Sequence, residues 1–301
     1  MKIHFQRILC ATDLSDYSNS AVIQAIGMAE EFGARLTICH VIDLPMVSMH
    51  GAAFVYQEDQ IEEMKAGALE QIQALVADRD LDWEAVVETG PVSHTLCRLA
   101  SEKQADLAIV STYGRTGIKR LFLGSVTERL LRTIGCPLLV VTPPEKAGQM
   151  ERQFKGFGFK QILVGCDFSA DSDRAVKFGF SLAQEFEAVI HLVHVIEPFA
   201  YRDAMLPDSV GAEALTEVTT GCRQRLEALV PEGAENWCKI EMICKTGKPF
   251  QSLIAYAEEH RVDLIVLGVR GHSLVETMLL GSTTDRVIRG VACPVLSVCP
   301  P

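Results

Sequence analysis

Residues 5–42 read "FQRILCATDLSDYSNSAVIQAIGMAEEFGARLTICHVI" and contain two predicted strands on either side of a helix. "QRILCAT" and "ARLTICHVI" have the length and apolar content of buried strands. The segment between them predicts a helix that a serine caps and Gly33 closes. Its apolar positions fall on one face: Ala21, Ala25, Met28, Ala29 and Phe32. A strand, a helix and a strand in this order predict a parallel pair with the helix packed on it.

The same alternation continues to residue 142. A longer helix is expected next, with one side lined by Ile61, Met64, Ala68, Ile72, Leu75 and Val76. The segments "WEAVVET", "ADLAIVST" and "PLLVVT" then predict strands, and "SHTLCRLASEKQ" and "GSVTERLLRTIG" predict the helices between them. We therefore expect an α/β fold in which a doubly wound, five-stranded parallel sheet of order 3-2-1-4-5 has helices on both faces.

The chain contains this unit twice. Phe5, Asp13 and His40 recur 154 positions later as Phe159, Asp167 and His194. Further along the offset becomes 157, so a length difference of three residues lies in the middle of the unit. A period of this size indicates two copies of one domain rather than a solenoid repeat. The predicted limits are a first domain at 1–143, a linker at 144–158 that is rich in Pro, Gly and charge, and a second domain at 159–301.

Composition limits the classes of protein to consider. Hydrophobic residues make up 48% of the 301 residues and charged residues 22%, which is typical of globular domains. A net charge of −11 without a basic tract argues against nucleic-acid binding. No run of about 18 apolar residues and no signal-peptide pattern occurs, so we expect a soluble, cytoplasmic protein without a membrane partner. The ten cysteines are scattered and form no C-x-x-C, so reduced thiols are expected.

A glycine pattern follows the fourth predicted strand of the second copy. Residues 267–283, "LGVRGHSLVETMLLGST", place Gly268, Gly271 and Gly281-Ser282 in the pattern Gly-x2-Gly-x9-Gly-Ser. Glycines let the backbone approach a ligand closely. The start of the next helix offers unpaired N–H groups and the positive end of the helix dipole, and both favour phosphate.

An aspartate is expected beside each glycine loop. In the order 3-2-1-4-5 the ends of the first and fourth strands are neighbours where the winding reverses, and ligands bind there. Asp13 and Asp167 follow the first strand of their copies. Such a carboxylate can accept hydrogen bonds from ribose hydroxyls, and Ser282 adds a hydroxyl donor. These features predict a nucleotide site.

Each feature also has a purely structural explanation. Glycines after a strand often serve only as turn residues, and a serine before a helix is usually an N-cap. Asp13 and Asp167 can cap the first helix without contacting any ligand. These features recur in both copies, so they were present in the domain before it was duplicated. The recurrence is not independent evidence that they bind a ligand.

These residues resemble the universal stress proteins in their tandem two-domain form. The second copy has that family's ATP-binding pattern in full, and both copies have its Asp after the first strand, its Val at the end of the second strand and its Cys-Pro before the last strand. The resemblance covers nearly the whole chain and implies ATP, alone or with Mg2+. The nucleotide-binding residues predicted in the second copy, the favoured site, are Asp167, Val195, Gly268, Arg270, Gly271, Gly281, Ser282 and Thr283. Those predicted in the first copy are Asp13, Val41, Ser111, Gly114, Arg115, Gly124 and Ser125.

The resemblance also implies how such a protein works. The Asp and the Val backbone would hold the adenosine, while the glycine loop and Ser would hold the ribose and phosphates. Most members are stress-induced cytoplasmic proteins with slow or absent ATP hydrolysis. Members pair through their last strands, so the halves of this chain are expected to pair with each other, with a homodimer of the whole chain as a further possibility.

The first copy departs from the pattern, because Ser111 stands where the second copy has Gly268. The Cβ of Ser111 either crowds the ligand or is tolerated, if φ at this residue stays negative. Charge favours the first copy, however, since its loop contains Arg115, Lys119 and Arg120 and could neutralise phosphates. We rank the second site higher because Mg2+ can replace missing cations, while a side chain in the path of the phosphates cannot move away.

Other motifs are weaker. Gly247-Lys248-Pro249 lacks the Ser/Thr and the upstream glycine of a P-loop. His40 and His194 are expected to be packed or surface side chains, although a zinc site of Cys and His stays an alternative. The apolar loops at 43–57 and 197–212 are either packed on the body, a lid over the nucleotide or a surface for a partner or a hydrophobic ligand.

Three function classes follow. The favoured one is a nucleotide-dependent stress or signalling module that acts on a protein partner, without a catalytic residue, because no general base is evident near the phosphates. A slow ATPase that uses Asp167 or a metal-bound water is the second. The third is a scaffold with vestigial sites, one half of which binds a hydrophobic ligand or a metal.

Overall fold

The computed structural model describes residues 3–44, 48–49, 52–53, 56–77, 79–113, 123–143, 157–197, 208–269 and 281–299. The chain divides into two compact units: an N-terminal unit of His4–Phe157 with Pro301, and a C-terminal unit of Gly158–Pro300 with Met1–Ile3. The domain limits expected from the sequence stay a prediction, since residues 144–156 lie outside the described residues.

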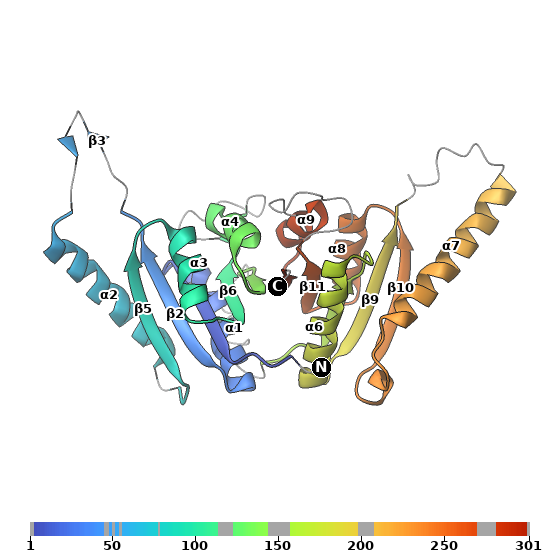
Figure 1. Ribbon diagram of the computed structural model, residues 1–301, viewed down its shortest axis with the longest axis horizontal. Coiled ribbons are helices and arrows are strands. Elements are labelled where there is room, and N and C mark those ends of the chain that lie inside the picture. Colours follow the sequence, from blue (N-terminus) through green and yellow to red (C-terminus); the bar gives the residue numbers. More distant parts are fainter. Residues whose placement is uncertain are drawn as a thin grey trace. The chain divides into compact units, whose positions relative to one another are not determined.

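The N-terminal unit is a parallel sheet of order β5-β2-β1-β6-β7 (Figure 1). Its elements, in chain order, are β1 (Arg7–Ala11), α1 (Asp16–Phe32), β2 (Arg35–Ile42), β3 (Ser48–Met49), β4 (Ala52–Ala53), α2 (Glu58–Val76), β5 (Trp83–Thr89), α3 (Val92–Glu102), β6 (Leu107–Ser111), α4 (Ser125–Thr133) and β7 (Leu138–Val141). The short strands β3 and β4 pair antiparallel outside the main sheet, within the first apolar loop.

The C-terminal unit repeats this sheet in the order β10-β9-β8-β11-β12. Its elements are β8 (Gln161–Gly165), α6 (Ala170–Phe186), β9 (Val189–Ile196), α7 (Asp208–Ala228), the 3-10 helix η3 (Ala234–Asn236), β10 (Ile240–Thr246), α8 (Pro249–Glu259), β11 (Leu264–Gly268), α9 (Ser282–Gly290) and β12 (Val295–Val298). In both units the strands follow the order 3-2-1-4-5, so the predicted doubly wound α/β fold is confirmed.

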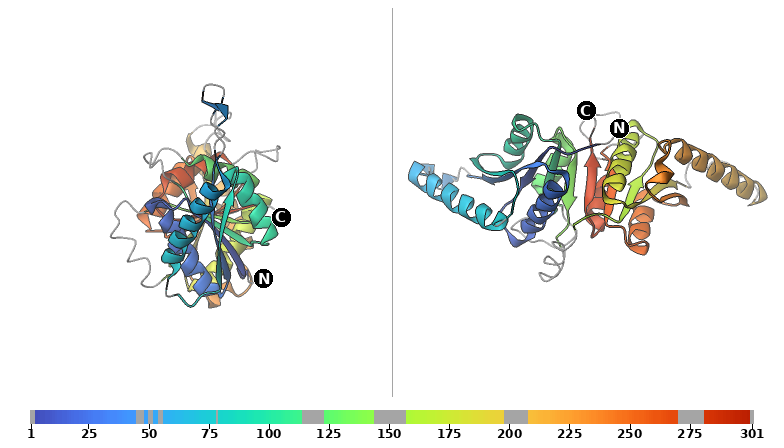
Figure 2. Two further views of the ribbon diagram at one scale, coloured as in Figure 1. Left: turned by 90° about the vertical axis from the view of Figure 1, so that its left-hand side faces the viewer. Right: turned by 90° about the horizontal axis from the view of Figure 1, so that it is seen from below.

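Helices cover both faces of each sheet (Figure 2). In the N-terminal unit α1 and α2 pack together on one face and α3 and α4 on the other, and α6 and α7 occupy the positions of α1 and α2 in the C-terminal unit. The first helix of each unit begins as expected, because the Ser15 and Ser169 side chains accept hydrogen bonds from backbone N–H groups of the first turn. Gly33 ends α1 in the left-handed conformation, with φ of 60°.

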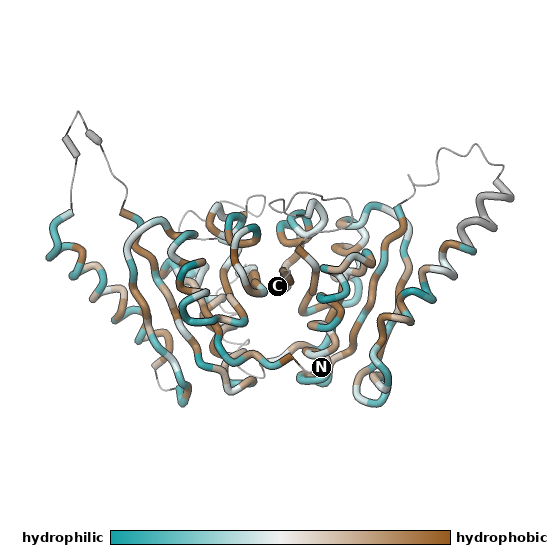
Figure 3. The backbone as a smooth tube through the Cα atoms, viewed as in Figure 1, coloured by the Kyte–Doolittle hydropathy of each residue, from teal (hydrophilic) through white to brown (hydrophobic). Residues whose placement is uncertain are grey.

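The core lies between the sheet and the helices, and hydrophobic residues concentrate along the strands (Figure 3). All five apolar positions predicted to line α1 are buried. The corresponding prediction for α2 is wrong at Met64, whose side chain is 42% exposed. No helix in the described part of the chain is long and apolar enough to cross a membrane.

The two units differ between their second helix and third strand. Residues 67–76 align with 221–230 at an offset of 154, and β5 aligns with β10 at 157, so the three extra residues lie between α7 and β10, beside η3. A second difference shows that the expectation of reduced thiols is wrong for one pair, because Cys222 and Cys244 form a disulfide with Cα atoms 6.6 Å apart. The packing of α7 on β10 brings these cysteines together.

Candidate functional site

A tight turn carries the aspartate of each copy from the first strand into the first helix. Asp13 Oδ1 accepts hydrogen bonds from the backbone N–H of Ser15 at 3.1 Å and from its hydroxyl at 2.6 Å. Asp167 Oδ1 accepts one from the backbone N–H of Ser169 at 2.9 Å. The aspartates therefore stabilise the turns that lead into the capping serines, and these bonds use only Oδ1 of each carboxylate.

Backbone strain accompanies both turns. Leu14 and Phe168, which directly follow the aspartates, both have φ of 62°. This left-handed conformation is uncommon for residues other than glycine, and such strain clusters at ligand sites. The same strain at the same place in both units indicates that the turn geometry is a property of the domain.

A histidine of the second strand fixes each turn from the side. The Nδ1–H of His40 donates to the carbonyl of Thr12 at 2.9 Å, and that of His194 donates to the carbonyl of Cys166 at 2.7 Å. These carbonyls immediately precede Asp13 and Asp167, so each histidine positions the aspartate turn. His40 is buried and His194 is half-buried. Val41 and Val195, which follow them, are each 8% exposed at the ends of β2 and β9.

A glycine begins the last helix of each copy and connects it to the preceding strand. The Gly124 N–H donates to the carbonyl of Thr112 at 2.9 Å, and the Gly281 N–H donates to that of Val269 at 2.9 Å. A Cβ added at Gly124 would lie 3.2 Å from the Thr112 carbonyl oxygen, so glycine allows this close approach. The helices α4 and α9 therefore begin beside the ends of β6 and β11.

A threonine that sequence reasoning missed strengthens this connection. Thr127 Oγ1 donates to the carbonyl of Ser111 at 2.9 Å, and Thr284 Oγ1 donates to that of Gly268 at 2.8 Å. These threonines are 157 positions apart, the offset that relates the two glycine patterns, and that recurrence is the signal that could have identified them. They fix the first turn of each helix and thereby the direction of its free N–H groups.

The Ser111 side chain is directed at the first helix, so crowding of the ligand by Ser111 gives no reason to rank the second copy above the first. Its Oγ donates to the carbonyl of Tyr17 in α1 at 3.2 Å, and its side chain is 8% exposed. At the matching place, a Cβ on Gly268 would lie 2.8 Å from the backbone carbon of Asp171 in α6. The choice between serine and glycine at this position therefore determines how closely the first helix lies to the fourth strand.

The order of the strands brings the described site residues of each copy to one end of the sheet, where the carboxyl ends of the strands lie. Strand β1 pairs with β2 on one side and β6 on the other, all parallel, so Asp13, Val41 and Ser111 lie at the carboxyl ends of neighbouring strands. Strand β8 likewise lies between β9 and β11. The glycine-capped helix follows the fourth strand in each copy. The remaining predicted residues, Gly114, Arg115, Arg270 and Gly271, lie outside the described residues, as do Lys119 and Arg120 and much of the apolar loops.

These groups fit a nucleotide. The first N–H groups of α4 and α9 have no acceptor within their helices, and they suit a phosphate. Carboxylate oxygens at the neighbouring strand end suit ribose hydroxyls. In the first copy Thr112 Oγ1 is also buried without a hydrogen-bond partner among the described residues, directly at the end of β6. A buried polar atom of this kind is usually satisfied by water or a ligand.

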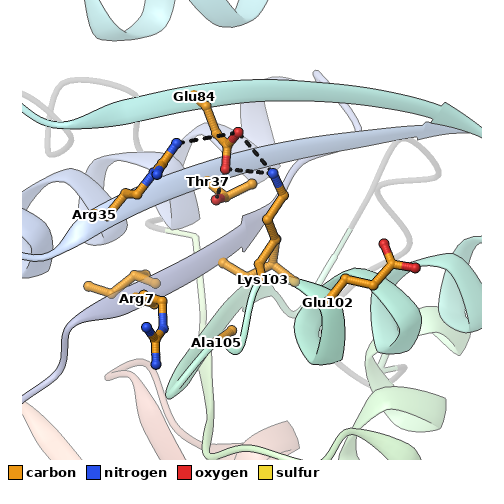
Figure 4. Close-up of a pocket in the computed structure, with 9 residues that line it drawn as sticks. Arg7, Arg35, Thr37, Glu84, Glu102, Lys103 and Ala105 are labelled. Atoms are coloured by element: carbon orange, nitrogen blue, oxygen red, sulfur yellow. Dashed lines mark hydrogen bonds and ion pairs between the residues drawn. The ribbon is translucent and has the colours of Figure 1, made fainter.

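A cavity of about 200 Å³ lies at the opposite end of the N-terminal sheet, where β1, β2 and β5 begin (Figure 4). Glu84 dominates it and is already satisfied, by Thr37 at 2.9 Å and by Lys103 at 2.8 Å. The hydrogen bond from Lys103 is the main reason that the pKa of Glu84 is lowered. Because Glu84 also pairs with Arg35, these side chains form a structural ion cluster at the start of the strands, whereas the glycine-capped helices follow a strand end.

No metal site accompanies these features in the described ranges. Among the described residues, no group of three or more His, Cys, Asp or Glu side chains is arranged to hold a metal ion. His191, three residues before His194 on β9, is hydrogen-bonded to Tyr256 Oη at 2.9 Å and to Gln161 Oε1 at 2.8 Å.

A family model described as the universal stress protein family matches residues 4–142 and again 158–298. The chain belongs to the universal stress protein family. Both matches span a complete five-stranded unit, so the chain contains two tandem universal stress protein domains, as its sequence predicts.

Relatives agree with this assignment over the full length. A universal stress protein of Mycolicibacterium smegmatis is 27% identical, and the alignment covers 97% of each chain. Universal stress protein MJ0531 of Methanocaldococcus jannaschii is 31% identical over 47% of this chain and 85% of its own length. The crystal structure of a universal stress protein from Archaeoglobus fulgidus shares the fold, with 22% identity, a TM-score of 0.65 and coverage of 97% of this chain and 98% of that one.

Proposed function

We propose that this universal stress protein binds ATP at the carboxyl ends of its sheets and acts as a nucleotide-dependent stress-response or signalling module. The observation that carries the proposal is that both units contain the same arrangement. In each, a strained aspartate turn lies beside a glycine-capped helix, between the first and fourth strands, where the strand order reverses. An anionic ligand with hydroxyl groups matches both parts of this site.

The residues divide the ligand between them. Asp13 or Asp167 accepts hydrogen bonds from ribose hydroxyls, with the backbone of Val41 or Val195 beside the base. The N–H groups and hydroxyls at the start of α4 or α9, from Ser125 in the first copy and Ser282 and Thr283 in the second, donate to phosphate oxygens. When bound, Mg2+ would supply positive charge to the phosphates. The proposal includes no catalytic residue.

Both copies keep the parts of the site that lie among the described residues. Ser111 is hydrogen-bonded to α1, and the loop of the first copy carries Arg115. We therefore propose two sites, and the second copy, with the full glycine pattern, is the first to test. The cytoplasmic location, the pairing of the two halves through their last strands, a homodimer and a protein partner stay proposals from the sequence.

Calorimetric titration of the full chain with ATP and Mg2+ tests this proposal. Asp167→Asn and Asp13→Asn each keep an oxygen for the turn but remove the charge and the second acceptor oxygen. We expect each substitution to weaken its own site at least about tenfold, since a hydrogen bond to a charged group is lost. Asp16→Asn, an exposed position in the first turn of α1, is the matched control. Absence of ATP binding by the wild type, or equal affinity in the Asp13 and Asp167 variants and the control, would overturn the proposal.

A further inference from the structure

The disulfide of the C-terminal unit connects its second helix to its edge strand. Cys222 lies on α7 and is 5% exposed, and Cys244 lies on β10 and is half-buried. The corresponding positions of the N-terminal unit are Ala68 on α2, also 5% exposed, and Val87 on β5. Both units therefore pack a helix on an edge strand at this place, but only the C-terminal unit does so covalently.

One end of the disulfide leads directly to the aspartate turn. In the pairing of β9 with β10, Cys244 is the register partner of His194. His194 donates to the carbonyl of Cys166, which precedes Asp167, at 2.7 Å. Its ring also lies 4.5 Å from the ring of Phe168, which follows Asp167. A shift of β10 at Cys244 would thus reach both neighbours of Asp167 through one side chain.

The other end leads to the same turn through the helix. Arg225 lies three residues after Cys222, so the two side chains share one side of α7. The guanidinium carbon of Arg225 lies 3.8 Å from the centroid of the Phe168 ring. Phe168 has the strained φ of 62° and needs surrounding contacts to hold it there. Helix, strand and turn therefore form a closed ring of contacts around the disulfide.

We propose that Cys222 and Cys244 form a reversible oxidation site for low-molecular-weight disulfides, and that the bond raises the affinity of the C-terminal unit for its nucleotide. The coupling rests on the proposed function, whereas the oxidation site stands independently of it. Oxidation fixes α7 on β10 and holds Arg225 and His194 against Phe168. Reduction leaves α7 held by non-covalent packing alone, so the turn that carries Asp167 is less constrained.

The chemistry needs only a small disulfide, R–S–S–R, as oxidant. The thiolate of Cys244, the more exposed of the two residues, attacks one sulfur of R–S–S–R, forms a mixed disulfide and releases R–S−, which takes up the proton from Cys244. The Cys222 thiolate then attacks the Cys244 sulfur, and the second R–SH leaves with the proton from Cys222. Two protein thiols lose two electrons in total, and R–S–S–R becomes two R–SH.

Neighbouring thiols compete poorly for the oxidant. Burial raises the pKa of the Cys166 thiol, which lies beside the aspartate turn. Burial also raises the pKa of Cys238 to about 11. Because the thiolate is the nucleophile, both side chains react more slowly with the oxidant near neutral pH than a thiol of ordinary pKa.

Thiol counting tests the oxidation site. The full chain is equilibrated with glutathione disulfide or with dithiothreitol, alkylated in denaturant and weighed by mass spectrometry, and its peptides are mapped. Of the ten cysteines, we expect eight to be alkylated after oxidation and all ten after reduction. The protected pair should be Cys222 and Cys244. Ten alkylated thiols after oxidation, or protection of another pair, would overturn the site.

Titration of the two forms with ATP and Mg2+ tests the coupling. We expect roughly fivefold or greater loss of affinity at the C-terminal site after reduction, within the range typical of coupled sites. Asp13→Asn is the background, because it weakens the first site and lets the second site dominate the titration. The double substitution of Cys222→Ala with Cys244→Val, which installs the apolar pair of the N-terminal unit, should bind like the reduced protein under both conditions.

A helix variant separates coupling from folding. Arg225→Met removes the cation over Phe168 and should reduce the redox dependence of ATP affinity to the part that acts through His194, while thiol counting still shows the disulfide. Arg223→Met, at an exposed position of the same helix, should keep the dependence. Equal ATP affinity of the oxidised and reduced protein would overturn the coupling and leave nucleotide binding intact. Failure of both forms to bind ATP would instead overturn the proposed function, and the coupling with it, while thiol counting still decides the oxidation site.

Discussion

His191 in the C-terminal unit occupies the position that Thr37 has in the N-terminal unit. Thr37 donates to Glu84, and His191 lies beside the corresponding Glu241, with its Nδ1 at 3.6 Å from the Glu241 carboxylate. Lys103 is replaced by His260, which stacks on Tyr256 at 3.8 Å. The N-terminal unit thus has a threonine and a lysine at these positions, and the C-terminal unit has two histidines, of which His191 is 2% exposed.

The buried imidazole predicts a pH dependence of stability. Burial lowers the pKa of His191 below its ordinary value, helped by the positive charges of His260 and Lys239 and opposed by Glu241. Because the unfolded chain then binds a proton that the folded chain does not, the free energy of unfolding falls as the pH drops below about 6.5, by at most about 1.4 kcal/mol per pH unit. Above that pH this contribution is constant.

Urea unfolding between pH 5 and 8 measures this effect. Each unit contains one of the two tryptophans, Trp83 or Trp237, so Trp83→Phe leaves the fluorescence of Trp237 to report on the C-terminal unit. His191→Gln should flatten the loss of stability at low pH, whereas His94→Gln, at an exposed position, should not. An unchanged slope in His191→Gln would show that His191 is protonated equally in the folded and unfolded protein.

At the scale of elements, the first helix approaches the fourth strand differently in the two units. In the C-terminal unit Gly268 lets the backbone of Asp171 come close, and in the N-terminal unit the hydroxyl of Ser111 occupies this place and holds the carbonyl of Tyr17. The distance between the start of the first helix and the fourth strand therefore depends on whether one Cβ is present. This dependence could not be predicted from the glycine pattern, because the pattern does not show which neighbour the glycine faces.

Substitution of that glycine should have a large cost. In Gly268→Ser the new Cβ would lie 2.8 Å from the backbone carbon of Asp171, so the start of α6 must move. We expect a loss of about 1–3 kcal/mol in the free energy of unfolding of the C-terminal unit, as for other overpacked sites. The reciprocal Ser111→Gly should cost about 1 kcal/mol, the value of one hydrogen bond. Tryptophan-resolved urea unfolding measures both, and wild-type stability of Gly268→Ser would contradict this packing.

Most elements themselves could be predicted from the sequence. The serine caps, Gly33 and the buried face of α1 follow from local periodicity, and the 3-2-1-4-5 order follows from alternating strands and helices. Met64 lies on the predicted apolar face of α2 but is exposed, because periodicity identifies a face of the helix and does not show how much of it the sheet covers. The supporting contacts of the site, such as those of Thr127 and His40, join residues that are distant in sequence and needed the structure.

At the scale of the whole molecule, duplication provides two copies of the fold that have since diverged. The repeat predicts both units and both candidate sites. It could not predict the Cys222–Cys244 disulfide, because that bond depends on the packing of α7 against β10 across a separation of 22 residues. Scattered cysteines without a motif carry no such signal.

The disulfide predicts unequal responses of the units to reductant. Closing a loop of this length contributes about 3 kcal/mol in the chain-entropy account. Dithiothreitol should therefore lower the free energy of unfolding reported by Trp237 in the Trp83→Phe protein by about that amount. It should leave the value reported by Trp83 in the Trp237→Phe protein unchanged. Equal shifts for both reporters would contradict an effect localised to the C-terminal unit.

The most direct test of the account is the nucleotide content of the protein itself. Freshly purified full chain is denatured, and any released nucleotide is identified and counted by chromatography and mass spectrometry, for wild type, Gly281→Val and Gly124→Val. We predict that the wild type releases ATP and that each substitution removes the share bound by its own copy, with circular dichroism confirming that the variants are folded. If the wild type releases no nucleotide and binds none when ATP and Mg2+ are added, the central claim is wrong.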